Sequence, residues 1–187
     1  MSRSKSALTL LALSMFLVLG VQEVGAQVQV ISLAAAAPST LTISVPSGAV
    51  QLIAGVTDNA INNFPSPVVI QTTWNVNPGQ TNTVSLVAYF SVPAQAMVGG
   101  SIQIPSSRVL GRVSTGLPTT FTAITQNGIG GVGTGGGSLQ LFSESINGLN
   151  KNASRIDNLD LQLDLVGFPT LPAGSYSGVL NIRAVTQ

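Results

Sequence analysis

Four leucines at every second position constrain the fold of this chain more than any other feature. The segment from Asn158 reads NLDLQLDL, so Leu159, Leu161, Leu163 and Leu165 alternate with Asn, Asp and Gln. Successive side chains of a β-strand point to opposite faces, whereas a helix would scatter these leucines around its circumference. The pattern therefore predicts a half-buried strand whose leucines face a core.

The chain after residue 39 repeats this strand-like pattern. The other segments are rich in Val, Ile, Thr and aromatic residues, which suit a pleated surface. They are Thr40–Val45, Val50–Ile53, Val68–Val76, Thr83–Phe90, Ile102–Ile104, Thr119–Thr125, Ser138–Phe142 and Tyr176–Val185. Turn residues separate them, and only Ala34–Ala37 and Ser143–Lys151 could host a helical turn. The sequence predicts an all-β fold, an antiparallel Ig-like β-sandwich, formed by residues 40–187 as a single domain.

The first 26 residues have the features of an export signal. Arg3 and Lys5 precede an uncharged, mostly apolar run from Ala7 to Gly20, and small residues end the segment at Ala26. The apolar run is shorter than the roughly 20 residues that span a bilayer as a helix. We therefore expect cleavage before Gln27, no membrane span in the mature chain, and a secreted or cell-surface location, periplasmic or extracellular.

Charged residues are scarce in the predicted mature chain. Removing 26 residues from the 187 leaves 161, in which five basic residues face five acidic ones. They are Arg108, Arg112, Lys151, Arg155 and Arg183 against Asp58, Glu144, Asp157, Asp160 and Asp164. Without a basic patch, we expect no nucleic-acid binding. A net charge near zero favours association between molecules, as in a subunit that assembles.

Two residue types on which many enzymes depend, His and Cys, are missing from the sequence. The chain has no His and no Cys, so the usual neutral-pH acid/base group and the commonest metal ligand are absent. Asp160 and Asp164 lie about 13 Å apart on an extended strand, beyond the ~5–9.5 Å of paired catalytic carboxylates in glycoside hydrolysis. A G-x-G-x-x-G spacing at Gly128–Gly133 leads into another strand pattern rather than a helix, which predicts a loop. We expect no catalytic, cofactor or metal site.

Two aromatic residues are candidates for stacking on a sugar ring. Trp74 follows Val68, Ile70 and Thr72 in even register, which also fits a core position. Tyr89 shares its register with both polar and apolar residues, so the sequence does not decide whether its ring faces the core or the solvent. A glycan-binding role would require one of these rings to be exposed.

The closing segment of the chain resembles a known class of exported domains. Residues 172–178 read P-A-G-S-Y-S-G and lead into an alternating strand, as in exported bacterial Ig-like domains, including pilin-like (fimbrial) and spore-coat-type subunits. The resemblance implies a secreted β-sandwich that ends on this strand.

An extended apolar segment precedes the predicted domain. Residues 27–39 carry Val28, Val30, Ile31 and Leu33, followed by alanines and a proline. Such a segment could pair with the sheet edge of a neighbouring molecule, as donor strands do in chaperone–usher pilins. It could equally be the first strand of its own domain or a mobile tail.

From these observations we expect a non-enzymatic structural or adhesive surface subunit. Strand addition by the N-terminal segment would link it to copies of itself or to a related surface subunit. The alternative is a secreted carbohydrate-binding β-sandwich module that uses Trp74 or Tyr89.

Overall fold

The computed structural model describes residues 39–187 of the chain. The predicted signal peptide, the candidate helical turn at Ala34–Ala37 and the strand-exchange candidates Val28, Val30, Ile31 and Leu33 lie outside the described residues. The described part is all-β, with antiparallel sheets and two short 3-10 turns, so the predicted fold class is confirmed. Among residues 39–187, no helix has the length and apolar character needed to cross a bilayer.

The larger sheet is built around two long central strands. β3 (Val68–Asn75) pairs with β10 (Asn152–Asp164), whose alternating leucines give the predicted burial pattern. The edge strand β1 (Thr40–Ser47) joins β3, while β7 (Val109–Val113) and the two-residue β8 (Thr122–Ala123) follow on the other side of β10. The short β2 (Ile61–Asn63) pairs with the end of β10.

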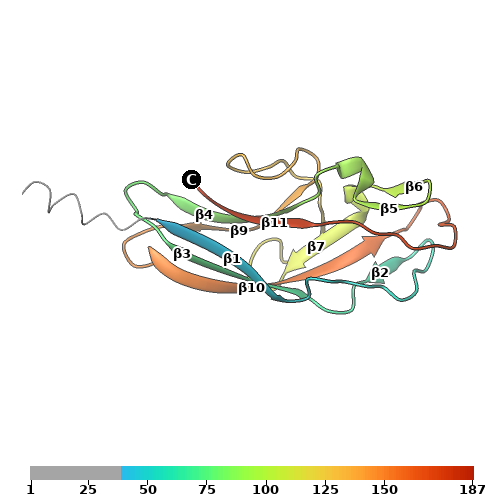
Figure 1. The fold of residues 1–187 in the computed structure, drawn as a ribbon, viewed down its shortest axis with the longest axis horizontal. Coiled ribbons are helices and arrows are strands. Elements are labelled where there is room, and N and C mark those ends of the chain that lie inside the picture. The colour runs from blue at the N-terminus through green and yellow to red at the C-terminus, as the bar shows by residue number, and fades with distance from the viewer. Residues whose placement is uncertain (1–38) are drawn as a thin grey trace, which may run out of the picture. The chain divides into compact units, whose positions relative to one another are not determined.

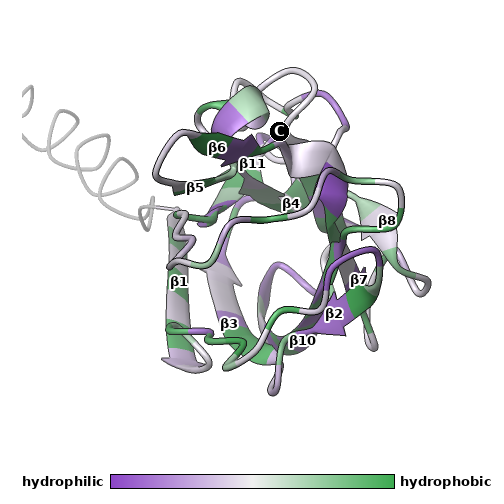
Figure 2. Ribbon diagram, turned by 90° about the vertical axis from the view of Figure 1, so that its right-hand side faces the viewer, coloured by the Kyte–Doolittle hydropathy of each residue, from purple (hydrophilic) through white to green (hydrophobic). Residues whose placement is uncertain are grey.

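The second sheet has three strands and lies across the core from the first (Figures 1 and 2). Its order is β11 (Asn181–Thr186), β4 (Thr83–Tyr89) and β9 (Ser138–Ser145). A separate hairpin, β5 (Met97–Gly99) with β6 (Ile102–Ile104), lies between the 3-10 turns η1 (Pro93–Gln95) and η2 (Ser106–Arg108). β4 is the central strand, and five consecutive residues in it are buried.

Apolar side chains of the two sheets form one core. Trp74 is 1% exposed, and its ring centroid lies 6.3 Å from that of Phe142. The indole nitrogen donates a hydrogen bond of 2.8 Å to the carbonyl oxygen of Asn150, which satisfies its one polar atom. Arg155 lies with its guanidinium 4.2 Å from the Phe142 ring centre and bonds the fully buried carboxylate of Asp157.

Several strand boundaries differ from the predicted ones. Val50–Ile53 is an irregular connection after β1, in which Val50 and Leu52 are exposed. Thr119–Thr125 contributes only the two residues of β8, and the last strand begins at Asn181 rather than Tyr176. Ser143–Lys151, which could have hosted a helical turn, instead continues β9 through Ser145 and then forms a turn bonded by Asn side chains. The loop predicted at the glycine-rich Gly128–Gly133 is confirmed, and four glycines in residues 128–137 adopt positive φ.

Candidate functional site

The two sides of the sandwich are closed to different degrees. On one side the outer edge of β9 is covered, since Leu117 donates its backbone N–H to Leu141 and Gln126 exchanges two backbone bonds with Ser138. On the other side, β1 and β11 are both edge strands, and no backbone group among residues 39–187 pairs with their outer edges. Unpaired edges of this kind are templates for another strand.

The order of the strands explains why this side is open. In an Ig-like sandwich, one sheet contains strands A, B, E and D, and the other contains C, F and G. By their order, β1, β3, β10 and β7 correspond to A, B, E and D, and β4 and β11 correspond to C and F. β9, on the other side of β4, has no counterpart among C, F and G. Within residues 39–187, no strand occupies the position of G beside β11.

Tyr176 supports the assignment of β11 as strand F. Its hydroxyl donates a hydrogen bond of 2.9 Å to the carbonyl oxygen of Pro172, four residues upstream. The bond resembles the tyrosine corner of Ig-like sandwiches, in which a tyrosine near the start of strand F bonds the upstream backbone, and Tyr176 precedes the start of β11 at Asn181. The P-A-G-x-Y segment singled out in the sequence is therefore the corner that leads into the last strand.

An apolar groove of about 660 Å³ lies at the open side, where β1 and β11 draw apart. Its volume is within the ~300–1,000 Å³ range of ligand pockets. One wall follows the end of β1 through Val45, Gly48 and Leu52, and the other is the chain from Ser175 to Ile182. No charged residue lines it.

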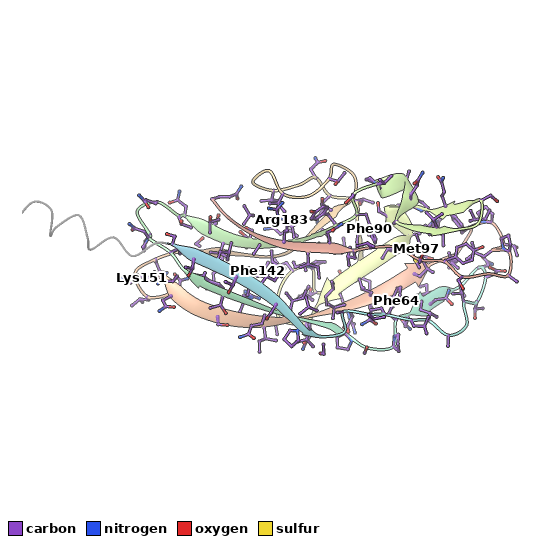
Figure 3. All side chains as sticks on the ribbon, viewed as in Figure 1. Phe64, Phe90, Met97, Phe142, Lys151 and Arg183 are labelled. Carbon is purple, nitrogen blue, oxygen red and sulfur yellow. The ribbon has the colours of Figure 1, made fainter. Side chains whose placement is uncertain are left out.

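The floor of the groove is the core of the sandwich itself. It is formed by Phe64, Val68, Phe90, Met97, Val109 and Leu161. Figure 3 shows Phe64, Phe90 and Met97 toward the β5–β6 end, away from Phe142 and Lys151. Leu161 and Val68 are 8% and 6% exposed, whereas most other core side chains on the same strands are at most 1% exposed. The core is thus incompletely covered at this place.

The β11-side wall is held against the β5 hairpin. Val98 and Ser177 exchange two backbone hydrogen bonds, at 2.8 and 3.0 Å. A Cβ on Gly178 would collide with the carbonyl oxygen of Ala96, and one on Gly99 would collide with the Tyr176 ring. These close backbone approaches need glycine, and they fix the wall in position.

The rim of the groove exposes large apolar side chains. Val179 is 74% exposed and Leu52 is 73% exposed. The side-chain oxygen Oε1 of Gln51 is buried in the wall and has no hydrogen-bond partner within residues 39–187. An extended apolar peptide could cover the valine and the leucine.

The structure corrects the stacking role considered for Trp74. The ring lies in the core with its nitrogen bonded, so neither of its faces can meet a sugar. Tyr89 is partly exposed at the end of β4, in the other sheet, so the fold does not bring the two rings together. Periodicity had indicated the core position of Trp74.

A second hollow lies on the outer face of the larger sheet, but its polar groups are already paired. Arg112 donates to Asp160 at 3.0 Å and covers the Phe121 ring at 4.6 Å from its centre. Gln162 donates to Asn63 at 2.7 Å. Asp164 accepts the backbone N–H of Val166, and no three acidic side chains gather within the described residues. The polar side chains of this face therefore pair with one another at the solvated surface.

The sequence did not reveal the groove, because its walls come from segments far apart in the chain.

Comparison with known proteins adds no family: the chain matches no protein-family profile, no curated protein and no solved structure.

Proposed function

We propose that this protein is an exported, non-enzymatic structural or adhesive surface subunit that assembles by strand addition. The observation that carries this proposal is the open side of the sandwich, where no strand of residues 39–187 pairs with the outer edge of β11 above a mostly apolar groove. A strand added there would complete the second sheet and would cover the exposed part of the core.

The chemistry of the groove supports a peptide strand as the ligand. Its described lining is mostly apolar and uncharged, and the adjacent strand edge offers a row of backbone donors and acceptors. In β-strand addition, these main-chain groups give affinity and pockets for alternate side chains give specificity. The scarcity of charge in the mature chain further favours association.

Light scattering and negative-stain microscopy of the chain beginning at Gln27, over a concentration series, test this function. We expect oligomers or filaments that persist at high salt, because the contact is apolar and main-chain in nature. Val179→Asp should reduce the assembled fraction at least tenfold, since it places a charge at the groove. The matched control is Leu149→Asp, at a residue that is 97% exposed in the β9–β10 turn. A monomer at every concentration would contradict the proposal.

A further inference from the structure

We propose that the glycine-rich hairpin between β8 and β9 is a removable guard, which keeps the β9 edge from pairing with a second copy of this chain. The hairpin runs from Gln126 to Ser138, at the closed side of the sandwich. This inference goes beyond the proposed function, which concerns only the open side at β11. It names a second interaction surface, which the folded subunit keeps covered.

The hairpin closes through a two-residue glycine turn. Ile129 and Val132 exchange two backbone hydrogen bonds, of 2.8 and 2.9 Å. Between them, Gly130 and Gly131 have φ values of 57° and 74°, positive at both central positions as in a type I′ turn. Seven of the ten residues from 128 to 137 are glycine, which loses more conformational freedom on folding than any other residue. Contacts with the rest of the domain must therefore hold the hairpin in place.

One apolar side chain anchors the hairpin. Val132 is 7% exposed and is the one buried hydrophobic residue between β8 and β9 besides Ile124, which belongs to the core. Val87 on β4 is also fully buried, although it points away from the core side of its strand. Among residues 39–187, these two valines are the only buried hydrophobic residues outside the core cluster. A separate small apolar contact therefore lies on the outer face of the second sheet.

The hairpin crosses this outer face. A Cβ on Gly130 would lie 3.0 Å from a methyl carbon of Val185, which is on β11 at the far side of β4 from β9. Figure 1 shows the segment as the gold loop on the side of β4 away from β3 and β10. The hairpin thus covers the sheet from its closed edge toward its open edge.

The base of the hairpin occupies the hydrogen-bonding edge of β9. Gln126 and Ser138 exchange two backbone bonds, of 2.7 and 3.0 Å. The side-chain oxygen Oε1 of Gln126 also accepts the backbone N–H of Gln140 at 2.8 Å. The part of β9 that begins here reads SLQLF and carries no charge. A strand edge of this composition pairs with another chain when nothing covers it.

A second copy of this chain is the partner that the uncovered edge fits. Two β9 edges can pair antiparallel about a two-fold axis, since each offers the same row of backbone N–H and C=O groups. This contact is closed and gives a dimer, whereas a heterologous contact at the open side continues from subunit to subunit. Leu117 still covers Leu141, so the pairing is short and we expect the dimer to dissociate on dilution.

Two substitutions in the hairpin separate the effect of the anchor from the effect of added charge. Val132→Asp places a charge at the buried anchor. Gly135→Asp adds the same charge at an exposed position of the same hairpin, where φ is not positive and a Cβ would meet only one atom, at 3.5 Å. Both are made in the chain that begins at Gln27 and carries Val179→Asp, which suppresses association at the open side.

Hydrogen exchange and light scattering test the guard. The backbone N–H of Ser138 is bonded to Gln126, and we expect it to exchange at least about tenfold faster in Val132→Asp than in Gly135→Asp. Light scattering over a concentration series should show a dimer for Val132→Asp and a monomer for Gly135→Asp, with Trp74 emission as the check of folding. Faster exchange without a dimer would overturn the second interaction surface, and unchanged exchange would overturn the role of Val132.

Gly131 provides a test that adds no charge, should Val132→Asp prevent folding. No atom lies within 4 Å of a Cβ at this position, so only its positive φ limits substitution. Asparagine tolerates a positive φ, whereas a β-branched residue does not. Gly131→Val should therefore open the hairpin and give the dimer, and Gly131→Asn should give neither. Identical behaviour of the two variants would overturn the guard.

The guard and the proposed function can fail separately. If the natural mature chain is a monomer at every concentration, the proposed function fails, yet Val132→Asp should still form a dimer. If the natural chain assembles but neither Val132→Asp nor Gly131→Val gives a dimer once Val179→Asp is present, the guard is wrong and the proposed function stands.

Discussion

The hydroxyl of Tyr176 bonds the carbonyl oxygen of Pro172 at 2.9 Å, and this bond fixes the corner from which β11 departs. The Tyr176 ring also lines the groove. Tyr176→Phe keeps the ring and removes the bond, so we expect the free energy of unfolding to fall by about 1 kcal/mol. Urea denaturation measures this change. Tyr89→Phe is the matched control, because no hydrogen bond of its hydroxyl occurs within residues 39–187, and an equal loss there would contradict the role of the corner.

The backbone contact between Gly178 and Ala96 leads to a second prediction. A Cβ at residue 178 would collide with a carbonyl oxygen, which belongs to the backbone and can yield only if the wall moves. We expect Gly178→Ala to destabilise the protein by about 1–3 kcal/mol, as overpacking does. The shifted wall should also weaken assembly at protein concentrations where the wild type is fully associated.

Gly174 provides the control for this substitution. Its φ is not positive, and a Cβ there would meet only one atom, at 4.0 Å. Gly174→Ala should therefore be neutral or stabilising by up to about 1 kcal/mol, since alanine restricts the unfolded chain. Chemical denaturation compares the free energies of unfolding of the two variants. Equal values would contradict the close approach between Gly178 and Ala96.

The elements with a clean alternation were predictable from the sequence. β10 and β3 were identified because apolar residues recur at every second position, and the core position of Trp74 fits the same periodicity. β4 was identified instead by its β-branched and aromatic residues, since five of its residues in a row are buried. β7 was missed because Gly111 and Arg112 interrupt its apolar pattern. Gly111 leaves room for the side chains of Leu139 and Leu159, on which a Cβ would press, and this tertiary contact is not visible in the local sequence.

The candidate site was only partly predictable. The Tyr176 corner and the apolar N-terminal segment were visible as motifs. The groove was not, because it depends on which strands lie at the edges of the two sheets, and sheet order follows from pairings between distant segments. Val50–Ile53 illustrates the difficulty, because its apolar residues suggested a strand, whereas Leu52 lies exposed on the groove rim.

Asp157 and Asp160 both lie on β10 but have different surroundings, and this difference leads to a third prediction, about stability. Asp157 is fully buried and accepts hydrogen bonds from Arg155, at 2.9 Å from Nε and 2.6 Å from Nη2, and from Thr115 at 2.9 Å. Asp157→Asn removes the carboxylate charge that Arg155 contacts most closely and leaves it only Glu144, at 3.4 Å, so we expect a loss of about 3 kcal/mol.

Asp160 provides the comparison for Asp157, because its partner is 47% exposed and the pair lies in solvent. Asp160→Asn should cost at most about 1 kcal/mol. Thermal and urea unfolding of both variants measure the difference. If both substitutions cost the same, the pairing of Arg155 with Asp157 contributes no more than an ordinary surface contact.

Trp74 is the one tryptophan of the chain, so its fluorescence reports directly on the core. Because the ring is 1% exposed, we expect acrylamide to quench its emission at least fivefold less in the folded protein than in urea. Adding oligosaccharides should leave the emission unchanged, since the ring has no free face. Phe142→Leu should raise the quenching, because it removes the neighbouring ring. Strong quenching of the folded wild type would place Trp74 at the surface and would restore the carbohydrate-binding alternative.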